Sequence, residues 1–146
     1  MVEMGEITLA MLRHHQIVNK NLLDLEKVSE EDTYKIVKFF NIFKWNLNKH
    51  IFVEEENIFP VADRKNKTEL KQLQNLLNDH RDIQKIIDNL DDEILDYRKP
   101  NTTILKELLF AHEEREIRSF YPLLDERLSD EKKKDVLEKL KDIKLK

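Results

Sequence analysis

The sequence predicts an all-α protein: an up-down-up-down four-helix bundle followed by a short charged C-terminal helix. Its 146 residues include one glycine and three prolines, too few for the tight turns of a β-protein, whereas helix formers such as Leu, Lys and Glu abound. Four long stretches carry apolar residues at helical spacing, and the short polar joints between them favour antiparallel neighbours. We therefore expect one domain over residues 1–146, with the bundle at about 6–127 and the accessory helix at about 129–144.

A polar joint separates the first two helices. The first helix is predicted from about residue 6 to 28, with an apolar seam that begins at Met4. Ser29 follows with three acidic residues behind it, an order typical of a helix N-terminus, because the hydroxyl caps free amides and the acids complement the helix dipole. The second helix is expected from this joint to about residue 63.

The boundaries of the later helices are also marked by capping and breaking residues. Asn66 with Glu69 three residues later resembles a capping box and opens the third helix. Pro100 ends that helix because proline has no amide hydrogen and restricts the residue before it. The fourth helix is predicted from near Thr102 towards residue 124. Ser129, followed by two acids, caps the charged C-terminal helix.

Charge and composition exclude several classes of function. The 30 acidic and 26 basic residues give a net charge of −4, which argues against nucleic acid as the main partner. The sequence has no cysteine, and this excludes disulfides, thiolate metal sites and cysteine nucleophiles. It also shows no signal-peptide pattern and no run of about 20 apolar residues such as a membrane span needs. We expect a cytoplasmic protein with no membrane partner.

A repeated pattern of histidine, glutamate, aromatic residue and proline stands out. In each copy the glutamate comes four residues after the histidine, the aromatic residue nine after it and the proline ten after it. The two copies are His50, Glu54, Phe59 and Pro60 and, in the same order, His112, Glu116, Tyr121 and Pro122. One further histidine precedes each copy, His15 and His80 respectively. The chain therefore divides into two helical hairpins with the same polar pattern.

These polar residues fall on helix faces that we expect to be buried. In each helix the histidine takes the place of an apolar residue in the seam, and in the second and fourth helices a glutamate four residues later shares its face. Burying a carboxylate is costly unless charge or hydrogen bonds compensate, and no Lys or Arg lies nearby on these seams. A metal cation would neutralise the glutamates and take neutral imidazoles as ligands. The predicted ligands are His15, His50, Glu54, His80, His112 and Glu116.

The donor set favours iron among the common metals. Four imidazoles and two carboxylates exceed the needs of one tetrahedral zinc ion, copper(I) prefers sulfur ligands, and calcium and magnesium prefer oxygen alone. Nitrogen and oxygen donors from four helices suit two non-haem iron ions, bridged by carboxylates and an oxo or hydroxo group, with open positions for a small ligand. The simpler interpretations are a hydrogen-bonded core histidine, for any one site, and a buried His–Glu pair. Repetition of the whole pattern favours the metal.

Residues beside the predicted ligands have less certain roles. His14 points about 100° away from His15 on a helix, and the apolar spacing that follows favours His15 as the ligand, with His14 on the flank. Four other acids are expected to face solvent: Glu55, Glu56, Glu113 and Glu114. Three polar residues are candidates for hydrogen bonds to the ligands: Gln84, Tyr34 and Tyr97. Six aromatic residues are candidates to line a ligand pocket, although their spacing is typical of plain core: Phe39, Phe43, Trp45, Phe52, Phe110 and Tyr121.

The order His, His-x-x-x-Glu, His, His-x-x-x-Glu resembles the hemerythrin-like (HHE cation-binding) domain over residues 6–127. Segments 11–15, 50–60 and 112–122 look like the helix signatures of that family. The resemblance implies two irons held by the six predicted ligands, with Glu54 and Glu116 as bridges. Oxygen-carrying hemerythrins have a further third-helix histidine where this chain has Gln84. Iron-centre repair proteins usually carry a cysteine-bearing N-terminal segment, which this sequence lacks.

Three hypotheses about function follow. The leading one is a non-haem di-iron protein that binds or senses O2, NO or a related oxidant at an open iron position. The second is a di-iron oxidoreductase that consumes peroxide or NO, or an iron donor for repair of iron–sulfur centres. The third is iron storage, or a regulatory domain that docks through its charged C-terminal helix. The expected partner is a small diatomic ligand or oxidant, and the sequence does not indicate which protein, if any, binds the chain.

Overall fold

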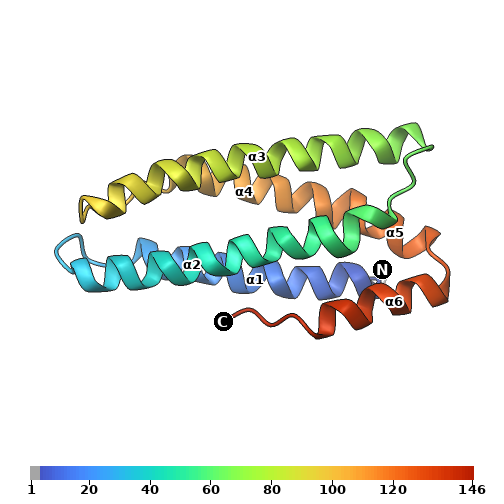
Figure 1. The fold of residues 1–146 in the computed structure, drawn as a ribbon, viewed down its shortest axis with the longest axis horizontal. Helices are drawn as coiled ribbons and strands as arrows, with labels where there is room; N and C mark the ends of the chain where they lie inside the picture. Colours follow the sequence, from blue (N-terminus) through green and yellow to red (C-terminus); the bar gives the residue numbers. More distant parts are fainter. Residues whose placement is uncertain (1–3) are drawn as a thin grey trace.

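The structure, a computed structural model, describes residues 4–146 and confirms the predicted all-α bundle. α1 (Glu6–Glu26), α2 (Thr33–Val53), α3 (Lys67–Leu95) and α4 (Thr103–Arg115) run alternately in opposite directions and lie side by side (Figure 1). Across the described part of the chain there is no β-strand. None of the helices described there is both long and apolar enough to cross a membrane.

The two helices that carry the glutamates depart from regular α-helix, where the sequence predicts unbroken helices. α2 passes into a π-helical turn, η1 (Glu54–Ile58), and then a 3-10 turn, η2 (Phe59–Val61). α4 passes into a second π-turn, η3 (Glu116–Phe120), which leads directly into α5 (Tyr121–Arg127). A π-turn closes hydrogen bonds between residues five apart and holds one residue more than an α-helical turn; such turns are frequent at functional sites. Each π-turn begins at a predicted ligand.

Side chains cap the N-termini of α2 and α3. The N-cap of α2 is Asp32, the last residue of the joint, and its side chain accepts from the amide of Lys35. Asn66 caps α3 as predicted, but Glu69 does not complete the capping box. Its buried carboxylate instead accepts from the Asp63 amide at 2.5 Å and from Arg127 Nε at 2.6 Å. Glu69 therefore ties the loop before α3 to the end of α5.

The N-terminus of α1 is capped by a residue that lies far away in the sequence. Asp125, on α5, accepts hydrogen bonds from the amides of Ile7 (3.0 Å) and Thr8 (2.9 Å) and from the Thr8 hydroxyl (2.7 Å). Gly5 allows this close approach, because a Cβ at that position would lie 2.2 Å from Asp125 Cγ. The helix begins after Gly5, so Met4, predicted to belong to the apolar seam, lies outside it and is 44% exposed.

Two apolar clusters fill the bundle, and the polar residues lie between them. The first cluster includes Met11, Leu76 and Phe120, and the second includes Val18, Ile83 and Leu109. Along α1, His15 falls between Met11 and Val18, and His80 interrupts α3 in the same way. The histidines therefore form a polar layer across a core that is apolar on both sides.

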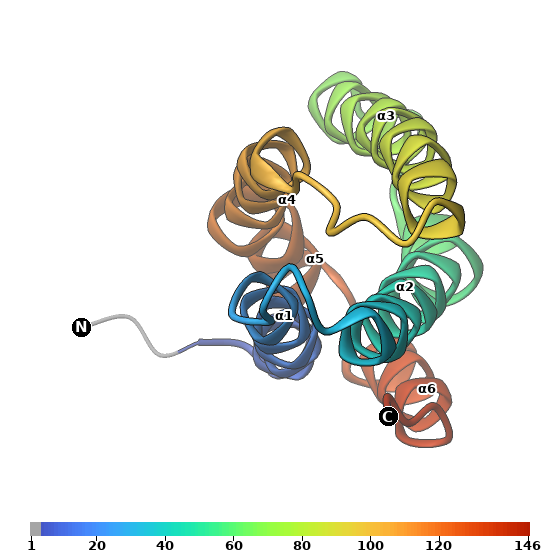
Figure 2. The same ribbon diagram turned by 90° about the vertical axis from the view of Figure 1, so that its left-hand side faces the viewer.

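α6 (Asp130–Lys141) lies outside the four-helix arrangement, beside α1 and α2 (Figure 2). It contributes Val136 and Leu140 to the first apolar cluster. Beyond α6 the chain returns along the bundle, and the main chain of Lys146 exchanges two hydrogen bonds with the buried side chain of Asn46, at 2.8 and 3.1 Å. The C-terminal part of the chain thus packs against α1 through α6 and against α2 through Lys146.

Candidate metal centre

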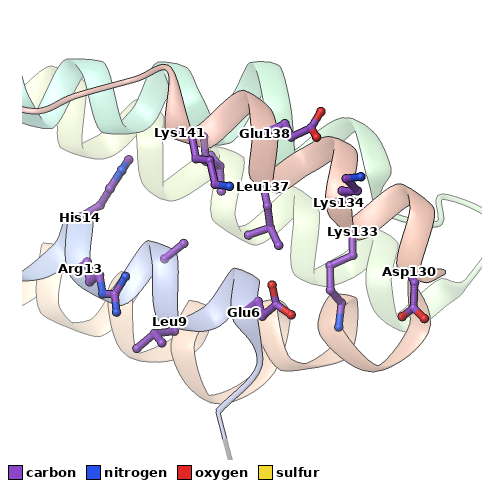
Figure 3. Close-up of a pocket in the computed structure, with 12 residues that line it drawn as sticks. Glu6, Leu9, Arg13, His14, Asp130, Lys133, Lys134, Leu137, Glu138 and Lys141 are labelled. Atoms are coloured by element: carbon purple, nitrogen blue, oxygen red, sulfur yellow. The ribbon is translucent and has the colours of Figure 1, made fainter.

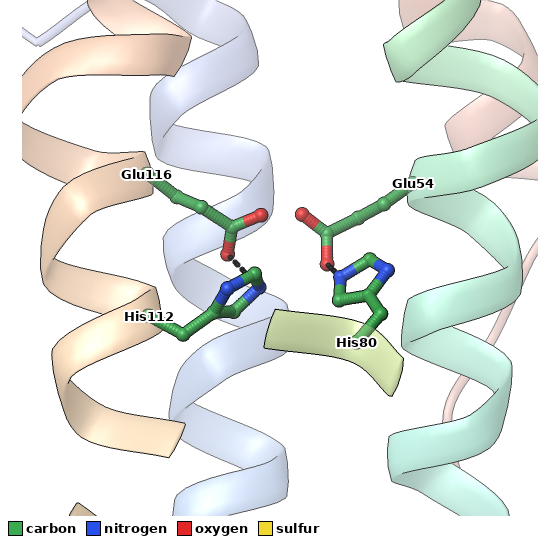
Figure 4. A group of neighbouring side chains, drawn as sticks. All are labelled: Glu54, His80, His112 and Glu116. Atoms are coloured by element: carbon green, nitrogen blue, oxygen red, sulfur yellow. Dashed lines mark ion pairs between the residues drawn. The ribbon is translucent and has the colours of Figure 1, made fainter. Parts of the chain in front are cut away.

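The structure brings all six predicted ligands together in the polar layer. Each helix of the bundle contributes a histidine, and the two π-turns contribute the glutamates. Their ligand atoms form two overlapping groups within 4.8 Å: Glu54, His80, His112 and Glu116, and His15, His50 and Glu116. All six side chains are at most 4% exposed. Figure 4 shows two of the histidine–glutamate pairs facing each other across the interior.

Each carboxylate turns one oxygen towards two imidazoles. Glu54 Oε1 lies 3.1 Å from His50 Nε2 and 3.4 Å from His80 Nε2. Glu116 Oε1 lies 3.1 Å from His15 Nε2 and 3.3 Å from the Nε2 of His112, its neighbour one turn earlier. The two halves of the site therefore have the same composition, two Nε2 atoms and one carboxylate oxygen.

The opposite ring nitrogens of three histidines have outer partners. Nδ1 of His80 lies 3.0 Å from Glu55 Oε2, and Nδ1 of His112 lies 2.9 Å from Asp79 Oδ2. Because an ionised carboxylate can only accept, Nδ1 carries a hydrogen in both rings, and in the neutral form of each ring Nε2 keeps its lone pair. Nδ1 of His50 lies 3.2 Å from Nδ1 of His14. Such contacts fix the tautomer and orientation of metal-binding histidines.

The inward-facing atoms lack partners of their own. Within residues 4–146, the buried Nε2 atoms of His50, His80 and His112 and Glu54 Oε1 lie 3.1–3.4 Å from a neighbouring ligand atom but make no hydrogen bond of acceptable geometry. Buried polar atoms without partners are rare in folded proteins because they retain the cost of desolvation. Three lone pairs and a carboxylate oxygen that converge in this way fit a bound cation, which would satisfy all of them at once.

The charge state of the site also suits a cation. Burial lowers the pKa of His15, His50 and His112, so these rings are neutral, as ligands must be. Burial acts on His80 in the same direction, but its contacts with carboxylates outweigh it and raise the His80 pKa. Burial would raise the pKa of Glu54, yet its histidine neighbours outweigh burial and hold that pKa well below its usual range. A carboxylate thus stays ionised among mostly neutral imidazoles.

Tyr121 is a site residue that the sequence did not single out for hydrogen bonding. It is fully buried, and its hydroxyl donates towards Oε2 of Glu54 and lies 2.9 Å from Oε2 of Glu116. Burial and the nearby Glu54 carboxylate raise the pKa of Tyr121 well above its usual value, so the hydroxyl keeps its hydrogen. The one available signal was the aromatic residue in the repeat.

One prediction about the flanking acids is wrong. Glu113, expected to face solvent, is 8% exposed and accepts from Asn19 Nδ2 at 2.8 Å, because its side of α4 is covered by α1. Burial raises the pKa of Glu113. Glu55 is exposed as predicted, with 42% of its side chain accessible, and it is also the outer partner of His80. Glu56 and Glu114 are exposed as predicted.

The polar residues predicted to hydrogen-bond the ligands, and the aromatic residues predicted to line a pocket, agree with the structure only in part. Gln84 donates to Asp88 on its own helix, and both Tyr34 and Tyr97 are exposed. Three of the six aromatic residues are exposed rather than part of a pocket: Trp45, Phe52 and Phe110. Of the other three, Phe39 is half-buried against the second apolar cluster, Phe43 is core, and Tyr121 reaches the carboxylates.

His14 connects the site to a groove on the surface. The groove, of about 690 Å³, lies between α1 and α6, with His14 towards one end and Asp130 towards the other (Figure 3). Its walls combine apolar residues such as Leu9 and Leu137 with charged ones such as Arg13. Burial and the neighbouring His50 lower the pKa of His14 to about 4, so the ring at this end is neutral.

Comparisons with known proteins agree with this geometry. The chain matches the family model described as the hemerythrin HHE cation binding domain over residues 7–136, which include α1 to α5 and half of α6. Searches of curated proteins and of solved structures each returned no significant match. Because the matched segment spans most of the sequence, the chain belongs to the hemerythrin HHE cation-binding domain family.

Proposed function

We propose that this chain is a non-haem di-iron protein that binds or senses O2, NO or a related small oxidant. The observation that carries the proposal is the set of inward-facing Nε2 atoms of His50, His80 and His112, whose rings have outer partners on Nδ1 and, in the described chain, no hydrogen-bond partner on the inner side. We assign His15, His50, Glu54, His80, His112 and Glu116 as the ligands. Four imidazoles and two carboxylates, with no thiolate, favour iron.

The donor count supports an open site. Shared between two metals, the six side chains offer each one two imidazoles and a share of the carboxylates, fewer donors than an octahedral iron takes. Bound iron would supply an open coordination position and electrons to a small ligand. The protein orients the donors through the outer partners of the histidines and excludes water with the two apolar clusters.

The groove between α1 and α6 offers an approach for such a ligand. It reaches His14, and His14 contacts His50. An uncharged diatomic molecule needs no charged guide, and the neutral His14 with apolar Leu9 and Leu137 nearby suits it. We assign this side of the bundle as the route by which small ligands reach the centre.

One observation favours the enzymatic alternative, a di-iron oxidoreductase that consumes peroxide or NO. Burial raises the pKa of the Glu113 carboxyl group, although the nearby His15 and His50 act against burial and lower it. A proton donor beside the metals would serve reduction of an oxidant, which needs protons as well as electrons. Turnover of peroxide or NO with an external reductant distinguishes this function from binding.

Metal content and spectra test the proposal. We expect about two irons per chain and visible bands that disappear on anaerobic reduction and return in air. The adjacent histidines of α1 provide a matched pair of variants. His15→Gln should lose iron, whereas His14→Gln should keep the stoichiometry with weaker binding, because His14 only orients His50. Wild-type protein that takes up no iron(II), or H15Q that retains two irons, contradicts the assignment.

A further inference from the structure

The hydroxyl of Tyr121 occupies a distinctive position between the two carboxylates. It contacts Oε2 of Glu54 and Oε2 of Glu116, while Oε1 of each glutamate faces imidazole nitrogens. One buried group thus touches both acids on the side away from the histidines. A hydroxyl has a single hydrogen, so it can donate fully to one carboxylate at a time. Tyr121 therefore couples the positions of the two glutamates.

The main chain, as well as the side chain, brings Tyr121 to this place. In η3 the amide of Tyr121 donates to the carbonyl of Glu116, five residues earlier, so the tyrosine lies over the glutamate. In a regular α-helix a residue five positions later would point about 140° away. η1 repeats the arrangement, since the amide of Phe59 donates to the carbonyl of Glu54.

The two halves of the repeat differ chemically at this position. Phe59 stacks on the His80 ring, with 5.3 Å between ring centroids and an angle of 19° between the planes. Phenylalanine has no hydroxyl, so the contact to both carboxylates comes from the second half alone. The two halves of the repeat, which supply the same donors, therefore differ by one hydroxyl group at this position.

We propose that Tyr121 is a positioning residue of the metal centre, whose hydroxyl holds Oε2 of both glutamates and so presents Oε1 of each to the metals. The inference rests on the proposed function, because it assumes that Glu54 and Glu116 are ligands. It assigns the centre a residue outside the His/Glu pattern. Tyr121 acts through the carboxylates and does not itself bind the metal.

Tyr121→Phe tests this role with little change in shape. We expect the variant to bind as many metal ions as the wild type, with 10- to 100-fold weaker affinity, the usual effect of losing a partner of a metal ligand. With cobalt(II) as the probe, its visible absorption bands should shift, because the freed oxygens change the coordination geometry. Loss of packing alone would leave the cobalt spectrum of the bound state unchanged.

The other two tyrosines provide matched controls. The chain contains three tyrosines, and Tyr34 and Tyr97 are both exposed. The same substitution, Y34F or Y97F, should leave cobalt affinity and spectrum unchanged. Y121F with wild-type affinity and spectrum overturns the inference and leaves the metal site intact. Wild-type protein that binds no metal overturns the proposed function itself, so the two failures are distinguishable.

A second measurement decides the matter if Y121F does not fold. In the double variant Y34F/Y97F, Tyr121 is the remaining tyrosine, and its ultraviolet absorption reports the hydrogen bond directly. Titration with zinc(II), which has no visible bands of its own, should change the tyrosine absorption in proportion to metal bound and saturate at the metal stoichiometry. Metal uptake with no change in that absorption overturns the inference.

Discussion

Replacement of Asp79, the outer partner of His112, tests the link between hydrogen bonding and metal affinity. Asp79 Oδ2 lies 2.9 Å from His112 Nδ1, and it also pairs with Arg115. In Asp79→Ala the imidazole N–H, on a side chain 3% exposed, loses its partner. Leaving a buried donor unpaired costs about 1–3 kcal/mol, and freeing the ring weakens binding about 10- to 100-fold, or roughly 1.4–2.7 kcal/mol. The two magnitudes agree.

The conservative variant Asp79→Asn separates charge from hydrogen bonding. Its amide oxygen can still accept from His112, but the negative charge is gone. Because a hydrogen bond to a charged group exceeds a neutral one by about 1 kcal/mol, we expect roughly a fivefold loss of affinity. The result should therefore fall between those for the wild type and D79A.

Competition with a chromophoric chelator under anaerobic conditions measures the iron(II) affinity of each variant. Glu114→Ala and Glu114→Gln are matched controls, since Glu114 is an exposed acid near His112 that pairs only with Arg118 among the described residues. These controls remove the same charge and should bind as the wild type does. If D79A binds iron as tightly as E114A, the argument that the outer partner orients His112 is wrong.

Two further predictions concern stability. Asp125→Ala should lower the free energy of unfolding by about 2 kcal/mol, because three hydrogen bonds that cap α1 are lost. Gly5→Ala should also lower the free energy of unfolding, because its Cβ would lie 2.2 Å from Asp125 Cγ. Urea unfolding measures both, and an unchanged midpoint in D125A would show that the cap contributes nothing. When the free metal concentration is about 100 times its Kd, removal of the metal should lower the free energy of unfolding by roughly 2.7 kcal/mol per site. Chelation should therefore lower the Tm. An identical Tm with and without chelator would mean that metal binding is not coupled to folding.

The bundle and the clustering of the six residues could be predicted because both follow from helical periodicity. An apolar seam interrupted by one histidine per helix has one arrangement that buries all four seams together, and that arrangement places His15 and His80 at the same depth. The position of His14 follows only in part from periodicity. Its flanking position follows from the phase of the seam, but its contact with His50 depends on the neighbouring helix.

Other features depend on contacts that periodicity does not contain. Asp125 caps α1 from more than a hundred residues away, so no local pattern announces it. Glu113 lies about 100° around the helix from His112, a direction that usually faces solvent, but here Asn19 of α1 covers it. The π-turns are missed because an α-helical template places Tyr121 off the face of Glu116.

The π-turns have a consequence for how such a centre is recognised in other sequences. Each holds one residue more than a regular helix needs between its glutamate and the aromatic residue. A chain shortened by one residue within 117–119 would close this stretch as ordinary α-helix. The tyrosine would then stand four positions after the glutamate, about 40° from it around the axis, still on the same face. The placement of the aromatic residue over the glutamate, rather than the number of residues between them, therefore defines the motif. A search that demands a fixed spacing would overlook relatives with an equivalent centre.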